Sequence, residues 1–246
     1  MTRASLFSSI TFAPLGDQTL VMQFEQTVSI ETSRKIQSFA RAITKKAIPG
    51  VTQLIITFTT IAVRYDPLKI GYGKLADKLS RLEEVEAVNE HSKSKTIHVP
   101  VVFGGDYGPD LQELASHAGI GAEEAARLLQ TGTYYVYMVG FAAGSPYCGD
   151  IDAALVRPRR ASPWLKVRKG TVAVANNQTT IYTIDSPGGW HLMGWTPMAM
   201  FDPHRERPGL LLAGDTIRYM PIDAGEAERW DDQRQEAWDW EWNPSS

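Results

Sequence analysis

The segment Asp185-Ser186-Pro187-Gly188-Gly189-Trp190 is the most informative stretch for the fold of the second half of the chain. A proline followed by two glycines and a large aromatic residue forms a tight turn in which the backbone can approach another group closely. Such a turn exposes N–H donors, and the indole of Trp190 can form a wall beside them. The segment Val139–Gly149 has the same character, with small residues, proline, aromatics and almost no charge. Two such loops predict a pocket for a small polar ligand.

The region around these loops is predicted to be mostly β. Short strands with frequent proline and glycine turns run from residue 134 to residue 222, which is typical of a barrel or a sandwich. Two short helices, at 109–119 and 122–130, precede them.

The first part of the chain has a different pattern. A strand is expected at 20–24, a helix at 29–47, a hairpin at 51–65, a helix at 69–84 and a strand at 96–103. This β-α-β-β-α-β order is that of a ferredoxin-like half. Polar residues 89–95 form the best candidate linker, so we expect an α+β domain at 1–92, a β domain at 93–224 and a tail at 225–246.

Composition narrows the class of protein. The 246 residues are 43% hydrophobic and 22% charged, with a net charge of −3, which offers no general attraction to nucleic acid or to an anionic membrane. No apolar run approaches the roughly 20 residues that span a bilayer, and the first fifteen residues do not resemble a signal peptide. A single cysteine excludes an internal disulfide and fits a reducing compartment, so we expect a cytoplasmic protein.

The tail combines acidic residues with tryptophans. Four tryptophans, Trp230, Trp238, Trp240 and Trp242, are interleaved with seven acidic residues between Glu226 and Glu241. Acidic runs are usually solvated, but exposed apolar surface tends to mark an interaction site. The tail is therefore expected to pack either on this chain or on a partner.

The sequence assigns no nucleophile and no metal ligand. Cys148 has no neighbouring histidine to stabilise a thiolate and is interpreted as a small apolar filler. The five histidines show no metal-ligand spacing, and no carboxylate cluster completes a site, so no metal is expected on this chain alone. The glycines at 140–146 lack the lysine and hydroxyl of a P-loop.

The spacing of several motifs resembles that of the KipI family. The matching motifs are GF-x-x-G-x-PY-x-G at 140–149, the run Pro158–Pro163, Gln178-Thr179, SPGGW at 186–190, Gly194-x-Thr196-Pro197, Phe201-Asp202-Pro203 and Gly214-Asp215. Leu15-Gly16-Asp17, Pro49-Gly50-Val51, Tyr65-Asp66-Pro67 and Tyr107–Leu111 follow the same order, so the resemblance runs from about residue 11 to residue 222. The family includes the B subunit of bacterial 5-oxoprolinase, allophanate hydrolase subunit 1 and the C and D subdomains of the urea carboxylase carboxyltransferase.

The resemblance implies both a fold and a function. It implies a ferredoxin-like N-terminal domain, a cyclophilin-like β-barrel, and the role of the B subunit in an ATP-dependent 5-oxoprolinase that opens a lactam to glutamate. ATP would be used by the complex. A second barrel subunit, of the type of the 5-oxoprolinase C subunit or of allophanate hydrolase subunit 2, would complete the site. Two alternatives are a carboxyltransferase or allophanate hydrolase-type subunit acting on urea-like amides and a non-enzymatic inhibitor of a sensor histidine kinase.

The same resemblance, with the loop chemistry, gives the expected substrate-binding residues. They are Phe141, Gly144, Pro146, Tyr147, Arg159, Gln178, Thr179, Ser186, Pro187, Gly188, Gly189 and Trp190. Arg159 falls on the arginine of a TPR motif and would bind an anionic group, and the Gln178 amide would orient the lactam. The chain departs from the family pattern at Ser145 (phenylalanine), Asn176-Asn177 (Gly-Gly) and Trp164 (arginine), which would reshape one wall of the pocket.

Overall fold

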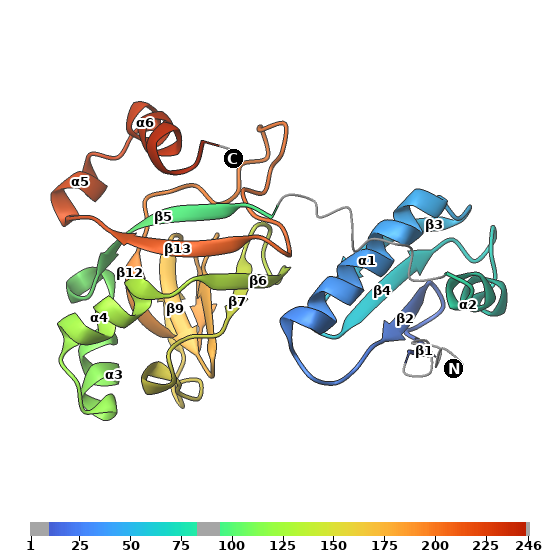
Figure 1. Cartoon of the computed structure of the whole chain (residues 1–246), viewed down its shortest axis with the longest axis horizontal. Coiled ribbons are helices and arrows are strands. Elements are labelled where there is room, and N and C mark those ends of the chain that lie inside the picture. The colour runs from blue at the N-terminus through green and yellow to red at the C-terminus, as the bar shows by residue number, and fades with distance from the viewer. Residues whose placement is uncertain (1–9, 83–93, 245–246) are drawn as a thin grey trace, which may run out of the picture. The chain divides into compact units, whose positions relative to one another are not determined.

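A computed structural model of the chain describes residues 10–82 and 94–244. It divides into two compact units, Met1–Lys93 and Ser94–Ser246, which are coloured blue to cyan and green to red in Figure 1. The candidate linker at 89–95 lies largely outside the described residues. Each unit has its own hydrophobic core.

The first unit is an antiparallel sheet of order β1-β2-β4-β3 with two helices. Its elements are β1 (Thr11–Pro14), β2 (Thr19–Gln23), α1 (Ile30–Lys46), β3 (Val51–Ile56), β4 (Thr60–Tyr65) and α2 (Tyr72–Ser80). Helix α1 begins at Ser29, whose hydroxyl accepts a hydrogen bond from Thr32 N, and it buries Ile36 and Phe39 on one face. That face packs against alternate residues of β2 and β4, and α2 contributes Leu75 and Leu79 to the same core.

The second unit is a closed seven-stranded barrel of order β10-β7-β6-β13-β5-β12-β9. Its strands are β5 (Thr96–Phe103), β6 (Tyr134–Val139), β7 (Pro146–Gly149), β9 (Thr171–Ala175), β10 (Gln178–Ile181), β12 (His191–Trp195) and β13 (Thr216–Pro221). Helices α3 (Leu111–Ala118) and α4 (Ala122–Thr131) are close to their predicted bounds and contribute to the barrel core (Figure 1). Two short 3₁₀ turns, η2 (Gly105–Tyr107) and η3 (Ala153–Leu155), lie between these elements.

Two elements of the N-terminal prediction are different in the structure. The strand at 96–103 pairs with β13 and β12 of the barrel and takes no part in the first sheet. Its place is taken by β1, which pairs with β2. Sequence pattern identifies a strand but not its partners, because pairing is decided by the tertiary fold.

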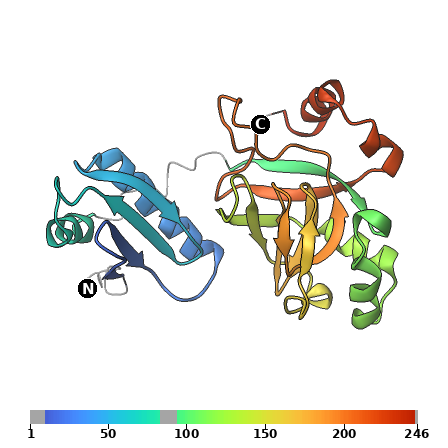
Figure 2. The ribbon, with the colours of Figure 1, turned by 180° about the vertical axis from the view of Figure 1, so that it is seen from behind.

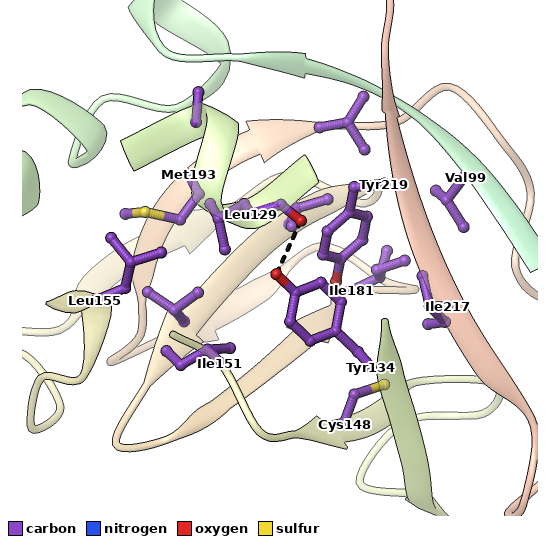
Figure 3. Packing of buried hydrophobic residues seen from close by; sticks show 14 of the residues in the cluster. Val99, Leu129, Tyr134, Cys148, Ile151, Leu155, Ile181, Met193, Ile217 and Tyr219 are labelled. Carbon is purple, nitrogen blue, oxygen red and sulfur yellow. Dashed lines mark hydrogen bonds between the residues drawn. The ribbon is translucent and has the colours of Figure 1, made fainter. Parts of the chain in front are cut away.

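The interior of the barrel is filled with side chains. Figure 3 shows the rings of Tyr134 and Tyr219 next to one another among aliphatic residues; the rings are tilted, with centres 5.3 Å apart. The Tyr134 hydroxyl donates to the carbonyl oxygen of Leu129 at 2.8 Å. Cys148 points into the same core, as predicted for an apolar filler, and burial raises the pKa of its thiol. A small barrel packed in this way leaves its outer face as the place for a ligand.

A two-stranded ribbon lies on that outer face. Strand β8 (Trp164–Val167) pairs with β11 (Ser186–Gly188). A separate apolar cluster holds the ribbon on the outer side of β9, β10 and β12 through Val167, Ala173, Ala175, Tyr182, Trp190 and Leu192. The SPGGW turn is thus fixed above the sheet.

The tail packs on its own chain. Helices α5 (Ala224–Glu228) and α6 (Asp232–Trp242) lie beside β5 in both Figure 1 and Figure 2. The backbone of His98 donates to Asn243 Oδ1 at 2.7 Å and accepts from Trp238 Nε1 at 2.8 Å. These side chains satisfy the backbone of β5 where β12 does not pair with it. No helix of the described residues is long and apolar enough to cross a membrane.

Candidate functional site

A cavity of about 310 Å³ lies between the outer face of the barrel and the SPGGW turn. Its walls come from the loop after β6, from β7 and β10, from the loop before β8, and from the turn itself. The lining residues are Phe141, Ser145, Tyr147, Arg159, Pro163, Thr180, Ile181, Tyr182, Pro187, Gly188, Gly189 and Trp190. The two loops that the sequence singled out therefore face one another across a single cavity.

The expected binding residues divide into those that line this cavity and those that do not. Phe141, Tyr147, Arg159, Pro187, Gly188, Gly189 and Trp190 line it; Gly144, Pro146, Gln178, Thr179 and Ser186 do not. Gly144 packs its backbone against the Phe201 side chain, and Pro146 is buried in β7. Gly144 and Pro146 therefore shape the loop that bears Phe141.

Strand alternation separates Thr179 from its neighbour Thr180. The Thr179 hydroxyl points into the barrel, where it donates to the carbonyl oxygen of Ala173 at 3.1 Å and lies 2.9 Å from the Tyr219 hydroxyl. Thr180 faces outward into the cavity, because successive residues of a strand point to opposite faces. Gln178 shares that outer face but lies about 6.6 Å along the strand from Thr180.

Two hydroxyl groups of the cavity have their protons committed to the protein. Thr180 Oγ1 donates to the carbonyl oxygen of Pro146 at 2.6 Å. Thr183 Oγ1 donates to the carbonyl oxygen of Ala143 at 2.7 Å, so the 2.8 Å contact between Ser145 and Thr183 uses the Ser145 proton. The oxygens of Thr180 and Ser145 are thus left as acceptors, which suits a ligand that presents an N–H group.

Arg159 is the charged residue of the lining. It is exposed at the cavity mouth, and its guanidinium carbon lies 5.7 Å from the centre of the Trp190 ring, within the range of a cation–π contact. Tyr147 meets the same indole edge to face, with ring centres 5.8 Å apart. With one arginine and no carboxylate, the lining has the electrostatics of an anion site.

Tyr182 closes the floor beneath the turn. Burial raises the pKa of its phenol, with a further rise from Tyr147, while Arg159 and the Trp190 backbone lower it. A Cβ added to Gly188 would come within 2.2 Å of the Tyr182 hydroxyl, so only glycine fits at that position. Tyr182 is not among the residues expected from the sequence, since its role depends on contact with a turn that follows it in the chain.

A larger and more open hollow of about 540 Å³ lies on the C-terminal helices. It is lined by Asp223, Glu226, Arg229, Asp231, Gln233, Arg234 and Ala237. Its best-placed cation, Arg234, is already paired with Glu226. The smaller cavity is the better candidate, because its lining combines one arginine with hydroxyl groups and includes no carboxylate.

The described residues hold no obvious metal centre. Within 10–82 and 94–244, no three histidine, cysteine, aspartate or glutamate side chains are grouped to bind a metal ion. His191 donates from Nε2 to the carbonyl oxygen of Pro158 at 2.9 Å, so it holds a loop and not a ligand.

The family model and the related proteins indicate the same family. The family "Carboxyltransferase domain, subdomain C and D" matches residues 10–211. The chain is 33% identical over 220 residues to the B subunit of the 5-oxoprolinase of Bacillus subtilis, which covers 85% of this chain and 91% of that protein. It is 34% identical over 217 residues to the corresponding B subunit of Escherichia coli O157:H7, with 86% and 95% covered.

Solved structures extend the comparison. The crystal structure of TTHA0988 matches with a TM-score of 0.74 at 33% identity and covers 84% of this chain; the match spans 40% of that longer protein. The urea amidolyase of K. lactis matches with a TM-score of 0.73 at 18% identity, over 93% of this chain and 16% of that protein, which bears on the fold alone. The resemblance inferred from the motifs is confirmed: the chain belongs to the carboxyltransferase subdomain C and D family and is a homologue of the 5-oxoprolinase B subunit.

Proposed function

We propose that this chain is the B subunit of an ATP-dependent 5-oxoprolinase and that 5-oxoproline binds in the cavity beneath the SPGGW turn. This placement is supported by the lining of the cavity. One arginine and hydroxyl acceptors line the same space of about 310 Å³, and no carboxylate lines it. 5-Oxoproline carries a carboxylate and a lactam N–H on a small ring. Its groups are complementary to those of the cavity.

Two polar groups of the cavity bind the two polar ends of the ligand in this proposal. Arg159 at the mouth pairs with the carboxylate of the ligand, for which a guanidinium fork is well suited. Thr180 Oγ1, whose proton is held by Pro146, accepts the lactam N–H. Tyr147 and Trp190 pack against the ring, and Gln178 lies too far along β10 to share this contact without a movement of the ligand.

The turn supplies the electrostatic part of the chemistry. A lactam resists hydrolysis until its carbonyl oxygen is activated, in this reaction by phosphorylation. The N–H of Gly189 donates no hydrogen bond to another described backbone group and lies beside the cavity, where it stabilises the negative charge of the phosphoryl group on that oxygen. Water then adds to the activated carbon, phosphate leaves, and the ring C–N bond breaks to give glutamate.

The remaining parts of the reaction are assigned to a partner. No residue of the cavity is placed to act as a nucleophile, and the lining includes no phosphate-binding loop. We therefore assign ATP binding and the completion of the active site to a second protein of the type of the 5-oxoprolinase C subunit. The complex is proposed to be cytoplasmic, in keeping with the single buried cysteine.

Affinity purification of the tagged chain from its own host, followed by mass spectrometry and an assay of glutamate release from 5-oxoproline, tests the proposal. We expect a second barrel subunit to co-purify and glutamate to form only when ATP is present. Retention on a biotinylated carrier protein without 5-oxoproline turnover would favour a carboxyltransferase, and a co-purified histidine kinase that is inhibited without turnover would favour a regulator. Either result would refute the 5-oxoprolinase assignment.

A further inference from the structure

Asp110 occupies the N-cap position of α3 but does not cap the helix. An aspartate at this position ordinarily accepts a hydrogen bond from the first turn, and here its side chain makes no such bond. The carboxylate is instead buried, with the residue 3% exposed. It accepts hydrogen bonds from Arg160 Nη1 at 2.6 Å, Trp164 Nε1 at 2.9 Å and the backbone N–H of Leu192 at 2.8 Å.

These donors connect two loops that are distant in sequence. Arg160 belongs to the loop that carries Arg159, Trp164 begins β8 directly after that loop, and Leu192 follows the SPGGW turn in β12. Both loops line the cavity. A single buried carboxylate therefore holds the two walls of the cavity mouth against one another.

The loop is anchored on both sides of Arg159. Before it, the carbonyl oxygen of Pro158 accepts from His191. After it, the Arg160 N–H donates to the carbonyl oxygen of Gly189 at 2.8 Å, and the Arg160 guanidinium is held by Asp110. Arg159 lies between these anchors with its guanidinium over the indole of Trp190.

We propose that Asp110 is a positioning residue that fixes Arg159 and the Gly188–Gly189 turn in their binding geometry by holding Arg160, Trp164 and β12. Its carboxylate does not line the cavity and acts through the residues that do. The identity of the ligand in this proposal rests on the proposed function, whereas the positioning itself is measurable without turnover.

Removing the charge while keeping the volume isolates this role. Asp110→Asn replaces one carboxylate oxygen with an NH₂ group, so at least one of the three donors loses its acceptor. Arg160→Gln breaks the same ion pair from the more exposed side and serves as a second variant if Asp110→Asn folds poorly. Glu113, whose Oε2 lies 3.8 Å from Arg160 Nη1, is exposed and a weak substitute.

Hydrogen–deuterium exchange on the isolated full chain is the first test. In Asp110→Asn and Arg160→Gln, peptides covering 156–164 and 186–192 are expected to exchange faster than in the wild type, with no change over α6. Asp152→Asn is the matched control, because the hydrogen bond that this exposed carboxylate accepts among the described residues is a local turn bond from Ala154 N. Unchanged exchange in both segments would overturn the proposal.

The second test measures kcat/KM of the co-purified complex with 5-oxoproline. A comparison of single and double variants distinguishes a positioning role from a general loss of stability. We expect Asp110→Asn to lower kcat/KM by about 10- to 100-fold, in line with misplacement of a binding group. In an Arg159→Ala background the same change should lower kcat/KM by a smaller factor than in the wild type, because the part of its effect that acts through Arg159 is already lost and only the part through the Gly188–Gly189 turn is left. Fully additive losses would refute the coupling; a wild-type complex without turnover would instead refute the proposed function and leave the exchange result to decide on Asp110.

Discussion

The adjacent glycines of the SPGGW turn allow one substitution to separate binding from folding. A Cβ on Gly189 would meet Pro163 at 3.9 Å (Cγ) and 4.0 Å (Cβ) and Arg159 Cβ at 4.0 Å, which are ordinary contacts, and the backbone there is not left-handed. A Cβ on Gly188 would lie 2.2 Å from the Tyr182 hydroxyl. Gly189→Val should therefore fill the cavity without disturbing the fold, and Gly188→Ala should disturb the fold.

The expected magnitudes follow from these distances. Gly189→Val should change the free energy of unfolding by no more than about 0.5 kcal/mol, as for a substitution without a clash. It places three carbon atoms beside the site of the ligand, and overpacking of about 1–3 kcal/mol would raise the Kd for 5-oxoproline by about 5- to 150-fold. Gly188→Ala should cost about 1–3 kcal/mol of stability, because the Tyr182 ring must move.

Urea denaturation gives the stabilities, and isothermal titration of the co-purified complex with 5-oxoproline gives the affinities. We expect different results for the two variants: Gly189→Val should lose affinity and keep its stability, whereas Gly188→Ala should lose stability. An unchanged Kd for Gly189→Val would remove the SPGGW turn from the binding site. A loss of stability above about 2 kcal/mol in Gly189→Val would refute the geometry of the turn.

Three further outcomes are expected. Arg159→Ala should weaken 5-oxoproline binding by about 10- to 100-fold, as for the loss of a charged hydrogen bond, whereas Arg168→Ala, which removes a cation stacked outside the cavity lining, should leave titrated affinity unchanged. Asn243→Ala should lower the free energy of unfolding by about 1–3 kcal/mol in urea, because the backbone of His98 loses its partner; equal midpoints would contradict this. Burial and then the Asp150 carboxylate raise the pKa of Tyr137 to about 12, so the folded state retains a proton that the unfolded state releases from about pH 10. The stability of the wild type should therefore fall between about pH 10 and pH 12 more steeply than that of Tyr137→Phe, and parallel curves would show that the phenol does not contribute.

The sequence was sufficient for features that depend on neighbouring residues. The SPGGW turn and the loop at 139–149 were identified because proline and glycine restrict or free the backbone at their own positions. Helix α1 was placed from its Ser29 cap and the periodic apolar face. The prediction that both loops meet at one pocket followed from their shared chemistry.

Features that depend on register needed the tertiary structure. Gln178-Thr179 was selected from the motif, yet the residues of that strand that line the cavity are Thr180 and Ile181. Adjacent residues of a strand point to opposite faces, so the choice between them is fixed by the pairing of β10 with β7 and β9. No short stretch of the sequence specifies how β10 is paired with β7 and β9.

The family, the turns and most of the helices and strands could be read from the chain alone, because each depends on spacing and backbone chemistry over a few residues. Strand β1 and helices α5 and α6 were not predicted. The long-range contacts could not be read in this way. Asp110 holds Arg160 and Leu192, 50 and 82 residues further along the chain, and Asn243 supports His98 across 145 residues. Such contacts form only when the barrel closes and brings distant segments together, and their energy depends on the burial that closure creates.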